Sequence, residues 1–212
     1  MRLRVIVMLT ASLFFASSTR AQWTGGIKIG TSYTDFSGDL VGGKTTWKRV
    51  LGLSAGASFG YELRGGLSAE TELLYLRMGA KTNVLYLDIP ATLTSKLVYL
   101  TMPVLLQYRL QAGQYLSPRF FAGPAGLFNL DALVAVAARP DDELLFEEDE
   151  SIEALDYGLM AGAALDFDVS DQRLTLEMRY YRGMMDVTKP AGEIGDSVLR
   201  NQGFVILIGV LF

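Results

Sequence analysis

Apolar and polar side chains alternate at every second position along much of this sequence, in segments of about ten residues. Leu174, Leu176 and Met178 share one parity, while Glu177 and Arg179 share the other. Successive side chains of a β-strand point to opposite faces, so such a segment lies between an apolar and a polar medium. A tilted strand crosses the hydrocarbon of a bilayer with about 9–11 residues. The alternation therefore predicts β-strands long enough to span a membrane.

Eight such segments are expected, and the connections between them alternate between long and short. The predicted strands are 23–33, 50–61, 66–79, 96–110, 117–130, 154–168, 172–184 and 202–212. The long connections are 34–49, 80–95, 131–153 and 185–201, and the short ones are 62–65, 111–116 and 169–171. Bacterial barrels have short periplasmic turns and longer extracellular loops. The sequence thus predicts an all-β fold, an eight-stranded antiparallel transmembrane β-barrel with up-and-down connections, whose termini are periplasmic and whose long loops are extracellular.

The N-terminal residues have the order of a secretory signal peptide. Arg2 and Arg4 precede an apolar run that ends at Ala16, and small residues follow it. The run is shorter than the roughly 18–20 residues that a membrane-spanning helix needs. We predict that residues 1–21 are a cleaved signal peptide and that residues 22–212 form a single outer-membrane β-barrel domain.

The composition argues against several classes of protein. Half of the residues are hydrophobic, yet no apolar run after the signal segment could span a membrane as a helix, and only helices and closed barrels satisfy every backbone group in lipid. The chain has no cysteine, hence no disulfide and no lipoprotein anchor. It has no histidine, the usual general base of barrel hydrolases and a common zinc ligand. We therefore expect no enzymatic activity and no cofactor.

The charge balance argues against nucleic acid as a partner. The whole chain carries a formal charge of −4. Removing the three arginines of the predicted signal peptide leaves 19 − 3 = 16 basic residues against 23 acidic ones, a charge of −7.

Charged residues gather on the parity that faces the barrel interior. They are Lys28, Glu70, Glu72, Arg109, Asp166, Glu177 and Arg179. The interior of an eight-stranded barrel is just wide enough to be filled by side chains, and buried charges persist only when they are paired. We predict a lumen closed by a structural network of ion pairs. An acid–base or glycosidase role for Glu70, Glu72 and Glu177 is the less favoured alternative.

Some segments do not fit the simple pattern. The strand 202–212 is apolar on both faces and places Val205 and Leu207 inside. The register of 117–130 cannot be assigned, and that of 66–79 is ambiguous because leucines share the parity of its glutamates. Pro103 and Pro124 fall inside predicted strands, where each removes a ladder hydrogen bond, so β-bulges are expected there.

The most acidic stretch lies in the third long connection. It contains Asp141, Asp142, Glu143, Glu147, Glu148, Asp149 and Glu150. Clustered carboxylates could hold Ca²⁺ shared with lipopolysaccharide phosphates, or meet a basic patch of a partner. The spacing of a dedicated calcium loop is absent, so a solvated extracellular loop is the favoured interpretation.

Several segments resemble a known family. They are VYLTMPVLLQYRL, RFFAGPAGLFNL, DYGLMAGAALDF, LTLEMRYYRGMMDV and the closing N-x-G-x-x-I-x-I-G-V-L-F. They are similar to the outer-membrane β-barrel family of Bacteroidetes-type bacteria often called PorT-like, over essentially the whole mature chain. The resemblance implies an eight-stranded barrel of the OmpA/OmpX type. The namesake of the family is associated with protein secretion and gliding. The terminal Phe212 likewise resembles the signal that outer-membrane assembly machinery recognises.

The sequence favours a non-enzymatic integral outer-membrane protein. Its extracellular loops would act in adhesion, envelope integrity or contact with another envelope protein. Alternatives are an accessory of a type IX secretion-like or transport assembly, a small-solute channel, and a soluble lipocalin-like carrier, which would need an apolar lumen. The expected partners are outer-membrane lipid, lipopolysaccharide and the barrel-assembly machinery.

Overall fold

The structure, a computed structural model, describes most of the predicted mature chain. The described residues are 23–39, 44–86, 89–111, 113, 115–139, 142–146, 153–170, 172–187 and 199–212. The predicted signal peptide, 1–21, lies outside them. Within these residues, no helix is long and apolar enough to cross a membrane.

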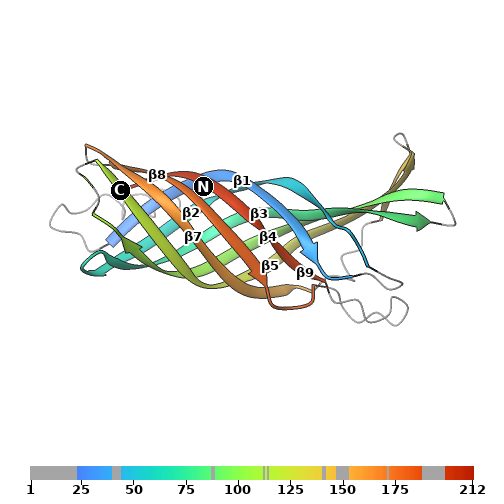
Figure 1. The fold of residues 1–212 in the computed structure, drawn as a ribbon, viewed down its shortest axis with the longest axis horizontal. Coiled ribbons are helices and arrows are strands. Elements are labelled where there is room, and N and C mark those ends of the chain that lie inside the picture. Colours follow the sequence, from blue (N-terminus) through green and yellow to red (C-terminus); the bar gives the residue numbers. More distant parts are fainter. Residues whose placement is uncertain are drawn as a thin grey trace, which may run out of the picture.

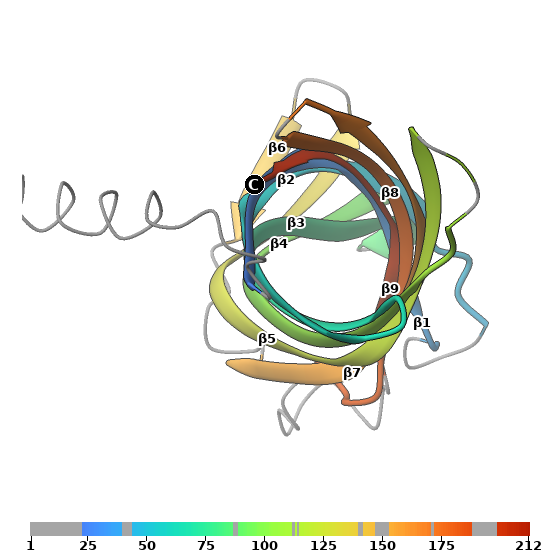
Figure 2. The ribbon, with the colours of Figure 1, turned by 90° about the vertical axis from the view of Figure 1, so that its left-hand side faces the viewer.

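Eight long antiparallel strands close into a barrel, and one short strand extends its wall (Figures 1 and 2). The strands are β1 (Trp23–Ser37), β2 (Lys48–Arg64), β3 (Leu67–Tyr86), β4 (Ile89–Arg109), β5 (Leu116–Arg139), β6 (Asp142–Phe146), β7 (Leu155–Val169), β8 (Gln172–Gly183) and β9 (Arg200–Leu211). Their order is β4-β3-β2-β1-β9-β8-β7-β5-β6, and a β4–β5 pairing closes the ring. This confirms the predicted eight-stranded antiparallel barrel, with β6 as an addition.

The outer wall is apolar and the inner wall carries the polar side chains. On β8, Met178 is 56 % exposed, whereas its neighbours Glu177 and Arg179 are 0 % and 1 % exposed. Leu174 and Leu176 lie on the same outer face and are exposed as well. A closed barrel with this wall satisfies the backbone internally and presents a mainly apolar surface to lipid.

The two ends of the barrel differ. One end, here called the short-turn end, carries the tight connections and the first and last strand residues, at the left of Figure 1. Gly65 and Gly66 join β2 to β3 with φ of 64° and 84°. Both values lie in the left-handed region that a two-residue hairpin turn requires, which explains the pair of glycines there. The opposite end is called the long-loop end.

At the long-loop end the strands are longer than predicted. The expected loop 80–95 is wrong, because β3 runs to Tyr86 and β4 begins at Ile89. The expected loop 131–153 is wrong in part, because β5 continues to Arg139 and then pairs with β6. Figure 1 shows these strand ends projecting beyond the other strands at the right. Hydrophobic alternation reports the medium on each side of a strand, and it fades where a hairpin stops separating lipid from lumen, although the backbone pairing continues.

The bulges expected at the two prolines are also absent. Pro103 faces Ala125, and Pro124 faces Leu159, with no register shift at either place. The Thr71 hydroxyl donates to the Pro103 carbonyl at 3.1 Å, so a side chain supplies a bond where the proline interrupts the ladder. The shift in the β4–β5 ladder lies instead between Val98 and Tyr99.

Candidate functional site in the barrel interior

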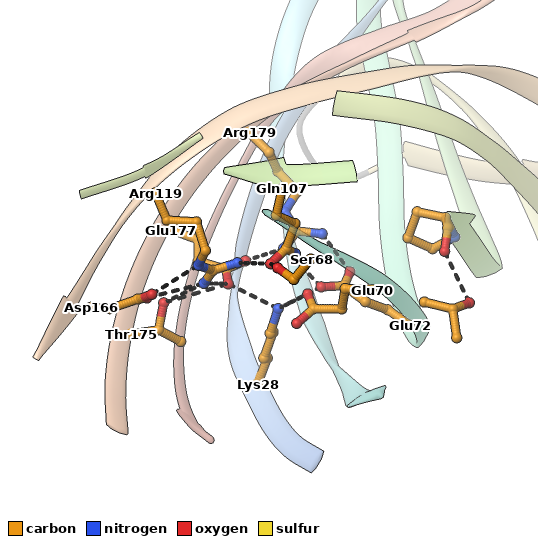
Figure 3. A network of polar contacts seen from close by, with 12 residues as sticks. Lys28, Ser68, Glu70, Glu72, Gln107, Arg119, Asp166, Thr175, Glu177 and Arg179 are labelled. Atoms are coloured by element: carbon orange, nitrogen blue, oxygen red, sulfur yellow. Dashed lines mark hydrogen bonds and ion pairs between the residues drawn. The ribbon is translucent and has the colours of Figure 1, made fainter. Parts of the chain in front are cut away.

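The predicted interior charges converge in the half of the lumen nearer the short-turn end. Six of the seven are at most 5 % exposed: Lys28, Glu70, Glu72, Asp166, Glu177 and Arg179. The seventh, Arg109, lies at the edge, with a side chain that is 20 % exposed. They come from β1, β3, β4, β7 and β8, so the barrel itself brings together residues that are far apart in the sequence. Figure 3 labels all of them except Arg109.

Lys28 lies at the centre of three carboxylates. Its Nζ is 2.7 Å from Glu70 Oε1, 2.6 Å from Glu72 Oε1 and 2.8 Å from Glu177 Oε1. An ammonium has three protons to donate, so this geometry can use all of them. The contacts tie β1 to β3 and β8 through the lumen.

Arg179 spans the lumen from β8 to β3. Its Nη2 donates to Glu72 Oε1 at 3.0 Å, and its guanidinium also bonds Glu177. Both carboxylates are shared with Lys28. Because the guanidinium bonds one carboxylate on β3 and one on β8, it fixes the distance between opposite walls of the barrel.

Arg119 joins the network from β5, although the sequence does not predict it there. Its Nε donates to Asp166 Oδ2 at 2.9 Å, and its Nη2 donates to Glu177 Oε1 at 2.8 Å. Further bonds reach Gln107 at 2.9 Å and Thr175 at 3.0 Å. The guanidinium therefore has a carboxylate or neutral acceptor on each of its nitrogens (Figure 3).

Charge balance is the signal that could have identified Arg119. The seven predicted residues comprise three cations and four carboxylates, which would leave one buried negative charge uncompensated. With Arg119, the network has four cations and four carboxylates. Since Asp166 also contacts Arg109 Nε at 3.2 Å, every one of the four carboxylates touches at least one cation.

An apolar layer covers the network on the side of the long-loop end. The Cζ atoms of Arg119 and Arg179 lie 5.7 Å and 5.1 Å from the ring centre of Phe121, close enough for a cation–π contribution. Further buried apolar side chains occupy the lumen: Leu74, Leu76, Leu105, Met160, Val205 and Leu207. The ambiguity of 66–79 is thereby resolved, because its leucines and glutamates both point inward, in separate layers.

A second polar cluster occupies the lumen nearer the long-loop end. The Asn201 amide donates to Asp156 Oδ2 at 2.9 Å and to the Tyr99 hydroxyl at 3.0 Å. All three residues are at most 1 % exposed. The sequence alone does not predict this cluster, because a lone carboxylate and an amide carry no spacing motif.

The carboxylates of the network are buried and paired. Glu70, Glu72 and Glu177 all share Lys28 and are at most 5 % exposed, so no carboxylate among them faces a substrate path. Within the part of the chain that the structure describes, no group of three or more His, Cys, Asp or Glu side chains could hold a metal ion.

The remaining predicted residues lie outside the network. Asp142 and Glu143 belong to strand β6. Asp141, Glu147, Glu148, Asp149 and Glu150 fall outside the described residues. Phe212 follows β9 and extends its pairing, since its backbone N–H donates to the Gly25 carbonyl at 2.8 Å and its carbonyl accepts from Gly25 at 2.9 Å.

A closed antiparallel barrel with an apolar outer wall and a packed ionic lumen defines a small integral outer-membrane β-barrel protein. The sequence profile of the outer membrane protein beta-barrel domain matches residues 15–189, and the chain belongs to this family. The finer PorT-like assignment stays a prediction.

Two solved structures are similar to this chain. The outer membrane protein OprG from Pseudomonas aeruginosa is 15 % identical, with 90 % of this chain and 95 % of that chain covered and a TM-score of 0.50. Neisserial surface protein A is 13 % identical, with 90 % and 96 % covered and a TM-score of 0.46. A comparison with curated proteins finds no match.

Proposed function

We propose that this protein is a non-enzymatic outer-membrane barrel that works through its long-loop end. In this proposal the short-turn end faces the periplasm and the long-loop end faces the exterior, where it acts in adhesion, envelope integrity or contact with another envelope component. The observation that carries the proposal is the filled lumen. Because eight paired charges and an apolar layer fill the interior, contacts with other molecules take place at the outer surfaces.

The projecting strand ends support an interaction role. β5 leaves β7 after Phe128, and from Val134 onward it pairs with β6. Together with the ends of β3 and β4, these strands extend the sheet beyond the barrel (Figure 1). Among the described strands, β6 pairs with β5 alone, so its other edge offers backbone groups to which a partner can add a strand.

Orientation is testable by labelling intact cells, since the chain has no cysteine of its own. Asn83→Cys, on the projecting part of β3, is expected to react with a membrane-impermeant maleimide. Arg64→Cys, at the short-turn end, is expected to react only after the outer membrane is permeabilised. Labelling of Arg64→Cys alone on intact cells would reverse the proposed orientation.

The filled lumen also makes a prediction against the channel alternative. The purified barrel in planar bilayers is expected to show no stepwise conductance in molar salt, because the ion network and the layer around Phe121 occupy the path. Regular single-channel steps from the folded protein would favour a small-solute channel.

An accessory role in a secretion or transport assembly is the second candidate. Two features favour it: the edge of β6 with which no described strand pairs, and the resemblance to PorT-like proteins. It differs from the first proposal in requiring a stable envelope complex, which chemical cross-linking in intact cells followed by gentle solubilisation would retain.

A further inference from the structure

The seam between β2 and β3 is interrupted towards the long-loop end. Arg49 pairs with Ala80, and the next ladder pair is Ser54 with Leu76, with a register shift between them. The intervening residues of β2, 50–53, continue to pair with β1. Over these residues β2 therefore keeps its backbone pairing with β1 and lacks its pairing with β3.

Hydroxyl groups of β1 close this seam from inside. Ser32 Oγ donates to the Arg77 carbonyl, and the Gly79 N–H donates to Thr34 Oγ1 at 2.9 Å. Gly52 makes room for these contacts, because a Cβ there would lie 2.4 Å from the Arg77 carbonyl oxygen. The backbone of β3 thus finds partners without β2.

On the outer face the same region forms a groove of about 500 Å³. Apolar side chains of four strands line it, including Leu51 and Leu53 of β2, which are 70 % and 58 % exposed, and Val98 of β4. Arg77, Lys96 and Asp131 line it as well. The groove thus combines an apolar surface with charged groups on the lipid-facing side of the barrel.

The charge of the groove favours an anion. It has two cations and one carboxylate, a net charge of 2 − 1 = +1. Within the described residues, no carboxylate lies in salt-bridge range of Arg77 or Lys96. The Arg77 guanidinium is held in place by Tyr75, whose hydroxyl accepts from Nε at 2.9 Å and whose ring centre lies 5.8 Å from Cζ. An oriented guanidinium without a protein counter-ion is suited to bidentate contact with a phosphate.

We propose that this groove binds the phosphorylated lipid A part of lipopolysaccharide. A phosphate would contact Arg77 and Lys96, and an acyl chain would pack along Leu51, Leu53 and Val98 through van der Waals contacts. The inference rests on the proposed orientation, which places the groove in the outer leaflet.

The test is native mass spectrometry of the detergent-solubilised full chain with lipid A that carries both phosphates. Arg77→Gln and Lys96→Gln are each expected to weaken binding about tenfold, the effect of losing one charge-assisted contact. Removing both phosphates from lipid A should weaken binding to the unchanged protein and abolish the difference between protein and variants. The matched control is Arg182→Gln, an exposed arginine of β8 that does not line the groove, and it should bind as the unchanged protein does.

Asp131→Asn distinguishes an anionic lipid from a zwitterionic one. Removal of this carboxylate should strengthen lipid A binding several-fold if the groove selects phosphate. Weaker binding would point to a phospholipid whose ammonium group contacts Asp131 and would overturn the proposal. An equal loss for Arg182→Gln and Arg77→Gln would overturn it too, because a diffuse basic belt would then bind the lipid. Binding in detergent does not depend on orientation, so a failure here is distinct from a failure of the cell-labelling experiment.

Discussion

Replacing Arg179 with methionine is expected to destabilise the barrel by about 3–5 kcal/mol, the usual effect of removing one partner from a buried ion pair. The guanidinium contacts both Glu72 and Glu177, and all three side chains are at most 1 % exposed. Without it, two buried carboxylates share the remaining cations. Urea unfolding in lipid vesicles, followed by the fluorescence of Trp23 and Trp47, measures the change.

Two further variants distinguish the loss of network contacts from the general effect of replacing an arginine. Arg182→Met changes the same residue type on the same strand but at an exposed position, and its effect should stay within about 0.5 kcal/mol. Adding Glu72→Gln to Arg179→Met should recover part of the loss, because it removes one orphaned charge. Equal stabilities for Arg179→Met and Arg182→Met would contradict the assigned role of the network.

Replacing Gly30 with alanine is expected to prevent most of the protein molecules from folding into a closed barrel. A Cβ at Gly30 would lie 1.8 Å from the Ile206 carbonyl oxygen, a backbone atom of β9 that cannot rotate away. Overpacking typically costs about 1–3 kcal/mol, and more when no side chain can yield. The contact lies in the β1–β9 seam that joins the first and last strands. The folded fraction after refolding is measured by heat-dependent mobility on gels.

Gly126→Ala is the matched control, since a Cβ there meets nothing within 4 Å. It should refold as the unchanged protein does. If Gly30→Ala refolds to the same fraction as Gly126→Ala, the close approach of β1 and β9 is not required for closure.

Much of the fold could be predicted because each strand separates two media. A strand between lipid and lumen must alternate, so the number of barrel strands and the placement of Glu177 and Arg179 follow from the sequence. Even β9, apolar on both faces, was assigned correctly from parity, since Val205 and Leu207 are 2 % and 0 % exposed.

The parts that could not be predicted depend on contacts between strands. Arg119 was missed because the register of its segment rests on pairing with β4 and β7, which the local sequence does not encode. The projecting hairpins are predicted as loops because the two-residue alternation fades in their sequence. The break between β2 and β3 depends on Gly52 and on the reach of Ser32, which belong to different strands.

The central claim is that neighbouring side chains of one strand lie in different media, and β9 tests it most directly because both of its faces are apolar. Single cysteines at Phe204, Ile206 and Ile208, spin-labelled in lipid bilayers, are predicted to show high collision rates with oxygen, and cysteines at Val205 and Leu207 low ones. Collision rates without a two-residue period, or with the opposite phase, would contradict the account.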